Sequence, residues 1–367
     1  MKKIAILVNS AANGGGEKIA VEMANYISKE TKYEVDLILI EDDVKYNINS
    51  SVKLIHFDRN NRLPGFISRL CSFFQVFFFL TRSRYDVVIS HLYVSNYLNA
   101  LVRCFSRYVS IGVTHGSINK YKRLTFKNLV NKIAIKCLFG KLDHKVFLTE
   151  GMCEDFYSLI GISDNNSCVI PNGYRFDNIY DMSLETRISI PYKKDDYFVF
   201  IGRAHEVKKI DNIISACIAA HKNLVIVGDG PLLKQLTELA NKSTFIHFCG
   251  QVPNPFPILK DSKALILASE TEGFPNVIIE ALALQVPVIS SDCRTGPREI
   301  IGIEQACSFG DIVHNKKGIL FSVGDEVALE NILENFSDYE FDKEDMLSTA
   351  KTYSLESMCK KYEEIMK

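Results

Sequence analysis

The sequence predicts an α/β protein built from two domains, each with its own parallel sheet. Apolar runs of strand length alternate with helical patterns from both ends of the chain, which is the order that βαβ units require. The chain has 367 residues, long enough for two domains of ordinary size. Residues 172–195 are rich in Asp, Asn, Ser, Tyr and Pro and lack apolar periodicity, so we expect the linker there.

Each half of the chain contains six expected strands, which are short apolar runs bounded by polar or glycine-containing segments. In the first half the strands are expected at 3–8, 34–40, 86–90, 109–113, 145–148 and 167–170. In the second half they are expected at 197–201, 223–227, 244–248, 264–267, 286–290 and 318–321. The first apolar run is soon interrupted by Asn9 and Ser10, so it reads as a buried strand and not as a secretion signal.

The most informative segment is Ser269-Glu-Thr-Glu272-Gly-Phe-Pro-Asn276, which follows one expected strand and precedes a helical run containing Glu280. In an open α/β sheet this order places Glu272 and free backbone N–H groups at the carboxyl end of the strands, where ligands bind. One carboxylate can accept hydrogen bonds from sugar hydroxyls and the other from a ribose diol, while the amides between them hold a phosphate. A nucleotide-sugar fits this spacing; a plain helix cap is the alternative.

A second segment, Gly202-Arg203-Ala-His-Glu-Val-Lys208, follows the strand expected at 197–201. Arg203 offers a bidentate fork and Lys208 a point charge, a combination suited to a pyrophosphate. Gly202 lets the backbone approach a ligand closely. The alternative is an ordinary pair of surface cations at a helix start.

Together with these segments, several further motifs make the chain resemble the retaining GT-B glycosyltransferases called group 1 or family 4. The further motifs are Gly14-Gly-Gly16-Glu-Lys, His115-Gly116, Pro171-Asn-Gly173, Gly228-Asp-Gly-Pro231 and Val286-Pro-Val-Ile-Ser-Ser-Asp292. The segment Cys293-Arg-Thr-Gly296-Pro297-Arg-Glu299 is similar to a sub-branch that builds bacterial surface polysaccharides and lipid-linked oligosaccharides.

The resemblance implies a role for each matching residue. Arg203 and Lys208 would hold the donor diphosphate, Glu272 and His115 the donor sugar, and Glu280 the ribose. The loop residues that would approach the donor are Gly15, Gly16, Gly202, Gly273, Phe274, Pro275 and Asn276. Two positions depart from the pattern. Lys18 stands where the sub-branch often has Arg, at a position that would contact the acceptor. Lys209 stands where Gly is common.

The resemblance also implies an architecture and a reaction. Two Rossmann-like domains would face each other across a cleft, spanning 1–175 for the acceptor and 190–350 for the nucleotide-sugar. A helix in 351–367 would cross back to the first domain. A UDP-sugar, with a lean toward galacto-type sugars, would be the donor and a lipid-diphosphate-linked saccharide the acceptor. Since no Asp-x-Asp follows a strand, we expect no catalytic metal and no cofactor.

The charge distribution points to an anionic partner for the first half of the chain. Residues 1–180 carry 23 Lys and Arg against 16 Asp and Glu, whereas the remainder carries 20 against 28. Apolar residues at 126, 129, 130, 133 and 137 recur at helical spacing beside Lys127, Lys132 and Lys136, as in an in-plane membrane helix. A core helix with solvated lysines is the alternative. A second apolar segment, 66–80, is too short to span a bilayer and is expected in an interface or under a domain.

The ten cysteines show no Cys-x-x-Cys pair and no zinc spacing, and most lie in apolar runs, where a free thiol packs as a small hydrophobic group. Since the first apolar run reads as a strand and not as a secretion signal, we expect a reducing cytoplasm. Together with the basic first half, this leads us to expect the protein at the inner face of the plasma membrane. No module typical of nucleic-acid binding is present in the sequence.

Three other functions are compatible with parts of the pattern. They are a GT-B nucleotide-sugar epimerase or phosphorylase, a nucleotide-cofactor oxidoreductase, and a non-catalytic peripheral membrane protein. A phosphorylase would need a pyridoxal lysine in a much longer chain. The oxidoreductase would use the Gly14–Gly16 loop, but this loop is not Gly-x-Gly-x-x-Gly.

Overall fold

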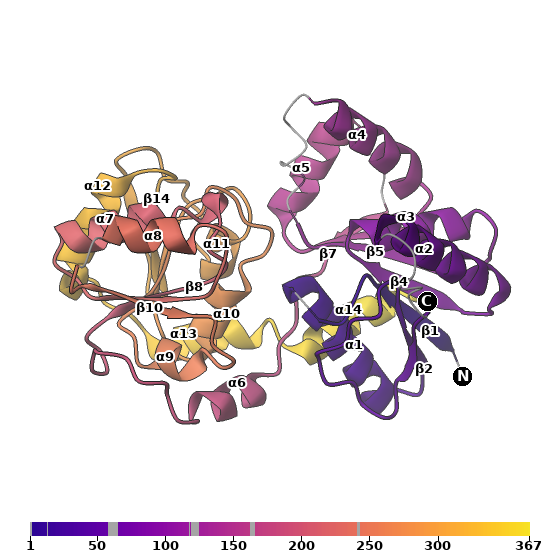
Figure 1. The fold of residues 1–367 in the computed structure, drawn as a ribbon, viewed down its shortest axis with the longest axis horizontal. Coiled ribbons are helices and arrows are strands. Elements are labelled where there is room, and N and C mark those ends of the chain that lie inside the picture. The colour runs from indigo at the N-terminus through magenta and orange to yellow at the C-terminus, as the bar shows by residue number, and fades with distance from the viewer. Residues whose placement is uncertain are drawn as a thin grey trace. The chain divides into compact units, whose positions relative to one another are not determined.

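The protein is described by a computed structural model that covers residues 2–12, 14–57, 65–116, 118, 125–161, 166–240 and 243–367, without the side chains of residues 65, 66, 126 and 127. Packing contacts divide the chain into two units (Figure 1). Unit 1 comprises Met1–Gly173 and Leu355–Lys367, and unit 2 comprises Tyr174–Ser354. Each unit is an α/β structure with its own sheet.

Unit 1 contains a parallel sheet in the order β3-β2-β1-β4-β5-β6-β7. Its strands are β1 (Lys3–Val8), β2 (Glu34–Leu39), β3 (Lys53–Ile55), β4 (Val87–His91), β5 (Val109–Thr114), β6 (His144–Phe147) and β7 (Ser167–Val169). Its helices are α1 (Gly15–Glu30), α2 (Gly65–Arg82), α3 (Tyr93–Arg103), α4 (Phe126–Phe139), α5 (Glu150–Ile160) and α14 (Leu355–Ile365). The central strands are almost wholly buried, as expected for a parallel sheet covered on both faces.

Unit 2 contains a sheet in the order β10-β9-β8-β11-β12-β14-β13, in which only β13 is antiparallel to its neighbour. Its strands are β8 (Phe198–Ile201), β9 (Leu224–Val227), β10 (Ile246–Gly250), β11 (Leu265–Leu267), β12 (Val288–Ser291), β13 (Ile312–His314) and β14 (Gly318–Phe321). Its helices are α6 (Phe176–Ser183), α7 (Ile210–Ala219), α8 (Leu233–Ala240), α9 (Phe256–Lys260), α10 (Asn276–Ala283), α11 (Pro297–Ile301), α12 (Glu326–Glu334) and α13 (Lys343–Lys351). Two short 3-10 helices, Glu206–Lys208 and Phe336–Asp338, complete it.

The prediction of two parallel-sheet domains is confirmed, and each of the twelve expected strands is present with its ends shifted by at most two residues. Two further edge strands, β3 and β13, were not expected, because each offers only two consecutive apolar residues, at 54–55 and at 312–313. The segment expected as a linker contains α6, which belongs to unit 2. The chain passes from unit 1 to unit 2 after Gly173 and returns after Ser354.

The C-terminal helix α14, yellow in Figure 1, belongs to unit 1 as the sequence resemblance implies. It packs beside α1, with Cys359 and Tyr362 buried. The backbone N–H of Gly173 donates to Sδ of Met358 at 3.1 Å. This packing ties the end of the chain to the domain in which the chain begins.

Both sheets reverse their strand order at one point, which is where open α/β sheets bind ligands. In unit 1 the reversal lies between β1 and β4, and in unit 2 between β8 and β11. Three of these strands are followed by predicted segments: Gly14–Gly16 follows β1, Gly202–Lys208 follows β8 and Glu272 follows β11. The predicted His115 follows β5, which pairs with β4. The topology therefore places three of the predicted segments at the two switch points and His115 one strand away.

Candidate active site

An ion pair joins the two loops at the switch point of unit 2. The Lys208 ammonium lies 2.6 and 2.8 Å from the two carboxylate oxygens of Glu272. Lys208 ends the 3-10 helix after β8, and Glu272 follows β11, so the pair bridges the reversal of strand order. Charge-assisted contacts of this length are among the stronger hydrogen bonds of proteins.

Glu272 is only 9% exposed, and two further contacts hold it, one through its side chain and one through its backbone. Ser269 Oγ donates to Glu272 Oε1 at 2.6 Å, and the Thr295 hydroxyl donates to the Glu272 backbone carbonyl. Gly296 follows with φ of 98°, and a Cβ there would lie 2.4 Å from Pro275 Cδ. The segment after β12 is thereby packed against the Glu272 loop, which fixes the carboxylate in place.

Ser269 and Thr295 are site residues that the sequence analysis did not identify, although both lie within segments that it quoted. A hydroxyl three residues before a carboxylate, as in Ser269-Glu-Thr-Glu272, was the available signal for Ser269. The contact of Thr295 with Glu272 has no signal in the sequence, because 22 residues separate them and only the fold brings them together.

Arg203 and Lys208, expected to act together, have different environments. Arg203 is exposed and makes no ion pair with any residue that the structure describes. Lys208 is engaged by Glu272. Arg203 is therefore exposed and unpaired among the described residues, whereas Lys208 is held by two contacts to Glu272.

The loop between Glu272 and α10 presents backbone donors. α10 begins at Asn276, and in the described part of the chain the N–H groups of Gly273, Phe274 and Val277 have no hydrogen-bond acceptor. The side chains are used differently: the Asn276 amide oxygen accepts from the Tyr174 hydroxyl at 2.5 Å. Orphan N–H groups at a helix start attract an anion, so the backbone of this loop suits a phosphate.

Glu280 lies on α10 with a half-buried side chain, one turn beyond the start of the helix. Glu280 therefore lies on the helix whose N-terminus attracts an anion, as the spacing of Glu272 and Glu280 predicted. A role in binding ribose stays a prediction.

Gly202 serves the packing of two loops. Gly228 has φ of 135°, and a Cβ there would lie 1.9 Å from the Gly202 carbonyl oxygen. The Gly202 N–H donates to the Val227 carbonyl at 3.0 Å. The glycines after β8 and β9 thus let the two backbones touch. This packing gives a structural reason for the Gly228-Asp-Gly-Pro231 motif, in addition to the ligand contact expected of Gly202.

The backbone conformation explains how Lys209 can stand where the family often has glycine. Its φ is 47°, the left-handed conformation that glycine adopts without steric cost. The Lys209 ammonium pairs with Glu270 at 3.0 Å. The lysine therefore keeps the turn that glycine more often makes.

In unit 1 the predicted glycine loop and histidine meet in one pocket of about 440 Å³. The pocket is lined by residues that include Gly14, Gly15, Gly16 and His115. A Cβ at Gly16 would lie 2.9 Å from Cγ of the His115 ring, so position 16 has no room for a side chain. Lys18 is exposed on α1, close to this loop in sequence.

The apolar stripe on α4 faces solvent. Leu129, Val130 and Ile133 are 54%, 48% and 55% exposed, whereas Phe139 is buried against aromatic side chains of α3 and α5. The structure therefore contradicts the alternative of an ordinary core helix for this stripe. Lys136 is exposed and Lys132 half-buried. The Lys127 side chain lies outside the described residues, as do Lys120, Lys122 and Arg123, the basic residues that precede α4 in the sequence.

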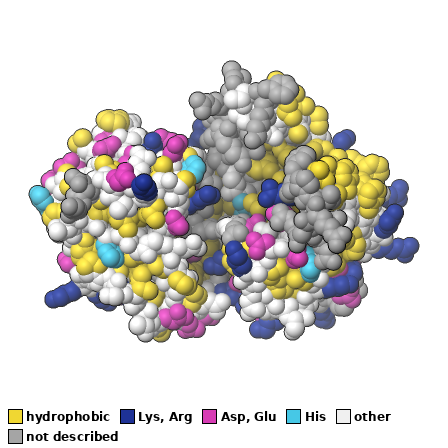
Figure 2. All heavy atoms as spheres, viewed as in Figure 1, with side chains coloured by type: hydrophobic (Ala, Val, Ile, Leu, Met, Phe, Trp, Pro, Cys, Tyr) yellow, Lys and Arg dark blue, Asp and Glu magenta, His cyan; other side chains and the backbone are white. Residues whose placement is uncertain are grey.

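The apolar segment on α2 is divided between two faces. Val76 and Leu80 pack into the core of unit 1, whereas Ile67, Phe74 and Phe78 are between 42% and 51% exposed. Figure 2 shows hydrophobic side chains gathered on the part of unit 1 that carries α4. Within the described residues, no helix has the length and apolar character needed to cross a membrane.

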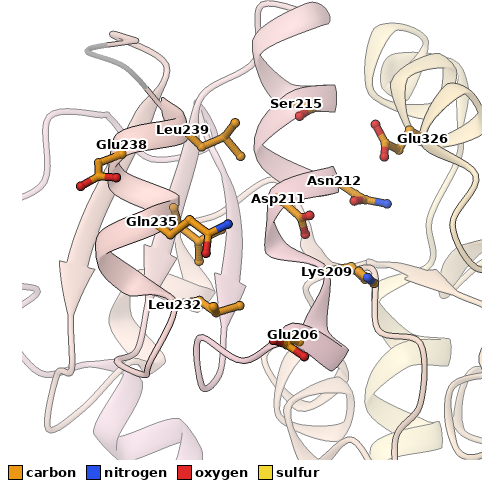
Figure 3. Close-up of a pocket in the computed structure, with 11 residues that line it drawn as sticks. Glu206, Lys209, Asp211, Asn212, Ser215, Leu232, Gln235, Glu238, Leu239 and Glu326 are labelled. Atoms are coloured by element: carbon orange, nitrogen blue, oxygen red, sulfur yellow. The ribbon is translucent and has the colours of Figure 1, made fainter.

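A larger hollow of about 620 Å³ lies in unit 2 between α7, α8 and α12 (Figure 3). None of the predicted site residues lines it. Four carboxylates do, from Glu206, Asp211, Glu238 and Glu326, and among the described residues Lys209 is the only cation of the lining. An acidic lining repels a diphosphate, so the donor is not assigned to this hollow despite its size.

Comparisons with known proteins agree with this geometry. A family model described as Glycosyltransferase Family 4 matches residues 13–177, and one described as Glycosyl transferases group 1 matches residues 195–337. An uncharacterized glycosyltransferase of Methanocaldococcus jannaschii is 32% identical over 200 residues, which are 52% of this chain and 49% of that protein. The chain thus matches about half the length of that relative.

A longer match is with a Campylobacter jejuni enzyme, N-acetylgalactosamine-N,N'-diacetylbacillosaminyl-diphospho-undecaprenol 4-alpha-N-acetylgalactosaminyltransferase. It is 27% identical over 327 residues, 83% of this chain and 85% of that protein. The crystal structure of Anabaena HepE in complex with UDP and glucose superposes with a TM-score of 0.75 at 16% identity and covers 99% of each chain. Glycosyltransferase models match both halves of the chain, and its two parallel-sheet units are those of the GT-B fold: the chain belongs to the GT-B glycosyltransferases.

Proposed function

We propose that the protein transfers a hexose or N-acetylhexosamine from a UDP-sugar to a saccharide acceptor carried on a lipid diphosphate, with retention of anomeric configuration. The product would be part of a bacterial surface polysaccharide. The Campylobacter relative, whose name states an N-acetylgalactosamine transfer to a diphospho-undecaprenol acceptor, supports the acceptor class and a galacto-type donor. The UDP in the Anabaena structure supports the nucleotide.

The observation that carries the proposal is the Lys208–Glu272 pair at the switch point, with exposed Arg203 and the open N–H groups of the α10 loop beside it. Cations and N–H groups suit a diphosphate, and a carboxylate suits sugar hydroxyls. Binding of the diphosphate would draw Lys208 to share its donors between phosphate and Glu272. His115 would contact the sugar from unit 1.

In the proposed reaction, an acceptor hydroxyl attacks C1 of the sugar on the face from which the diphosphate leaves. The bond from C1 to the diphosphate oxygen breaks, the new glycosidic bond forms, and the leaving diphosphate takes the hydroxyl proton. Arg203 and Lys208 stabilise the negative charge that grows on the diphosphate. Since both oxygens of Glu272 are held by Lys208, a sugar-contacting role suits Glu272 better than that of a nucleophile.

A panel of UDP- and GDP-sugars assayed against lipid-diphosphate-linked acceptors tests this function. We expect turnover with a UDP-hexose or UDP-N-acetylhexosamine, and an α-configured product by NMR if an α-linked donor is used. Thermal shifts with UDP, GDP, NAD and liposomes separate the alternatives. Stabilisation by NAD and not by UDP would overturn the proposal.

Metal independence is the first prediction. Because Arg203 and Lys208 supply the positive charge near the diphosphate, we expect EDTA to leave the transfer rate within about twofold of its original value. The measurement is initial rate with and without chelator, with a metal-dependent glycosyltransferase as the control for effective chelation. Loss of activity in EDTA that manganese or magnesium restores would contradict the prediction.

Docking of unit 1 on the inner face of the plasma membrane is also part of the proposal. It is supported by the exposed stripe of Leu129, Val130 and Ile133 on α4, by its flanking lysines, and by the net charge of +7 over residues 1–180. An apolar helix face with basic flanks binds an anionic membrane surface in two ways: its apolar side chains are buried in the interface, and its lysines are attracted to the lipid charge. Such docking would bring the enzyme to a lipid-linked acceptor.

We expect replacement of Lys127, Lys132 and Lys136 by Gln to weaken binding to anionic liposomes about a hundredfold, since each lysine near the surface contributes about 1 kcal/mol. Co-sedimentation at low salt measures the effect, and added salt should weaken binding by screening. The matched control removes three exposed lysines of unit 2, Lys234, Lys343 and Lys351. Equal losses in both triple variants, or wild-type protein that ignores the liposomes, would contradict docking through α4.

A further inference from the structure

Two histidines lie in contact at the carboxyl ends of neighbouring strands of unit 1. His91 ends β4, and His115 directly follows β5. Their rings stack with centroids 5.1 Å apart and planes inclined by 28°, and Nδ1 of His91 lies 2.8 Å from Nε2 of His115. The sequence analysis identified His115 but not His91, which is the last residue of a buried strand.

Buried polar residues near this pair hold the two strands together. Asn96, at the start of α3, donates to the Val113 carbonyl at 2.9 Å and accepts from the Ser90 hydroxyl at 2.8 Å. Asn99 donates to the same hydroxyl at 3.0 Å. These side chains are fully buried, so the network fixes β4, β5 and α3 relative to one another and sets the spacing of the two histidines.

One hydrogen bond joins the two rings, and both imidazoles are neutral. Burial lowers the pKa of His115 to about 4. Burial and the neighbouring His115 also lower the pKa of His91 well below its ordinary value. At neutral pH each ring carries one proton, so one ring donates across the 2.8 Å contact and the other has its proton on its outer nitrogen.

The two possible tautomers differ in where that remaining proton sits. The outer nitrogens, Nε2 of His91 and Nδ1 of His115, are buried and have no hydrogen-bond partner among the described residues. If His115 donated, the remaining proton would sit on Nε2 of His91, a residue that is fully buried and does not line the pocket. If His91 donates, the proton sits on Nδ1 of His115, the residue that lines the pocket with the glycine loop. Of the two histidines, only His115 lines the pocket. Because an unsatisfied buried donor is costly, we expect the second arrangement, in which the outer donor belongs to the ring beside the space that a ligand can enter.

The backbone beside His91 shows strain of the kind found at functional sites. Leu92 has φ of 74° and ψ of 158°, a region that is otherwise occupied almost only by glycine. Leu92 also lines the pocket. A strained residue persists where its surroundings determine it, and this one directly follows His91 at the end of β4.

We propose that His91 is a positioning residue for glycosyl transfer: it holds the His115 imidazole in one orientation and one tautomer, with Nδ1 of His115 as a hydrogen-bond donor to an oxygen of the donor sugar. The inference rests on the proposed function, since it takes His115 to be the sugar contact. His91 itself touches no substrate.

Two amide variants separate positioning from packing. In His91→Asn the side-chain amide occupies the place of Nδ1 and can still donate to His115, whereas in His91→Gln the amide reaches the place of Nε2 and cannot. We expect His91→Asn to retain kcat within about fivefold and His91→Gln to lose about 30-fold or more. UDP affinity should be unchanged in both variants, because the UDP contacts are assigned to unit 2. Equal kcat in the two variants would overturn the proposal.

A second measurement does not depend on activity. Nitrogen-15 NMR of histidine-labelled protein distinguishes the two tautomers, with the His115 signals assigned through His115→Gln. We expect His115 to be protonated at Nδ1 in wild type and in His91→Asn, and to become protonated at Nε2 or mixed in His91→Gln. Wild-type His115 protonated at Nε2 would overturn the inference. Because this reading holds even if no tested sugar is transferred, failure of the proposed function is recognised separately.

Discussion

Replacing Glu272 with Gln is expected to reduce transfer at least about a hundredfold, the scale of losing one preorganised contact that stabilises the transition state. The carboxylate lies at the switch point of unit 2, only 9% exposed, and is held by Lys208 and Ser269. Gln keeps the size of the side chain and can still accept from Ser269, so the fold should survive. Initial rates at saturating donor, together with the melting temperature, measure the two effects separately.

Glu270→Gln is the matched control for this variant. Glu270 lies two residues earlier in the same loop, and its side chain is 49% exposed and pairs with Lys209. We expect this control to retain its rate within about twofold, because an exposed ion pair contributes little. Near-normal turnover in a well-folded Glu272→Gln variant would remove Glu272 from the site.

The second large effect is expected from the cations. Neutralising Arg203 or Lys208 should each cost at least about 2 kcal/mol in kcat/KM, or about 30-fold, the scale of a lost charge-assisted contact. UDP affinity, measured by calorimetry, should fall in both variants. Lys209→Met is the control, since it removes a neighbouring ammonium that pairs with exposed Glu270. Unchanged UDP binding in both site variants would exclude them from the diphosphate site.

Stability should distinguish the two cations. Arg203 is exposed and has no ion-pair partner in the described part of the chain, so Arg203→Met should leave the melting temperature nearly unchanged. Lys208→Met leaves the buried Glu272 carboxylate without its cation and should lower stability by about 1–3 kcal/mol. In Lys208→Met/Glu272→Gln the loss should be smaller than the sum of the single losses, because the two residues interact. Additive losses would show that the pair is not coupled.

Much of the fold could be read from the sequence, because parallel strands buried on both faces are continuous apolar runs separated by turn residues. All twelve expected strands are present, and the motifs stand at strand ends as their order along the chain requires. Since ligands of open α/β sheets bind at the carboxyl ends of strands, the order of strands and loops along the chain was enough to locate the site segments. The short strands β3 and β13 could not be located in this way, because each offers only two consecutive apolar residues.

What the tertiary structure alone decided is which of these residues are partners. Lys208 and Glu272 were expected to contact different parts of one ligand, and their pairing follows from the adjacency of β8 and β11, which strand order along the chain does not reveal. Thr295 and His91 reach Glu272 and His115 from other strand ends. The sequence determined the two domains and the chemical groups at their strand ends. Their hydrogen bonds depend on distances of a few tenths of an ångström, which long-range packing sets.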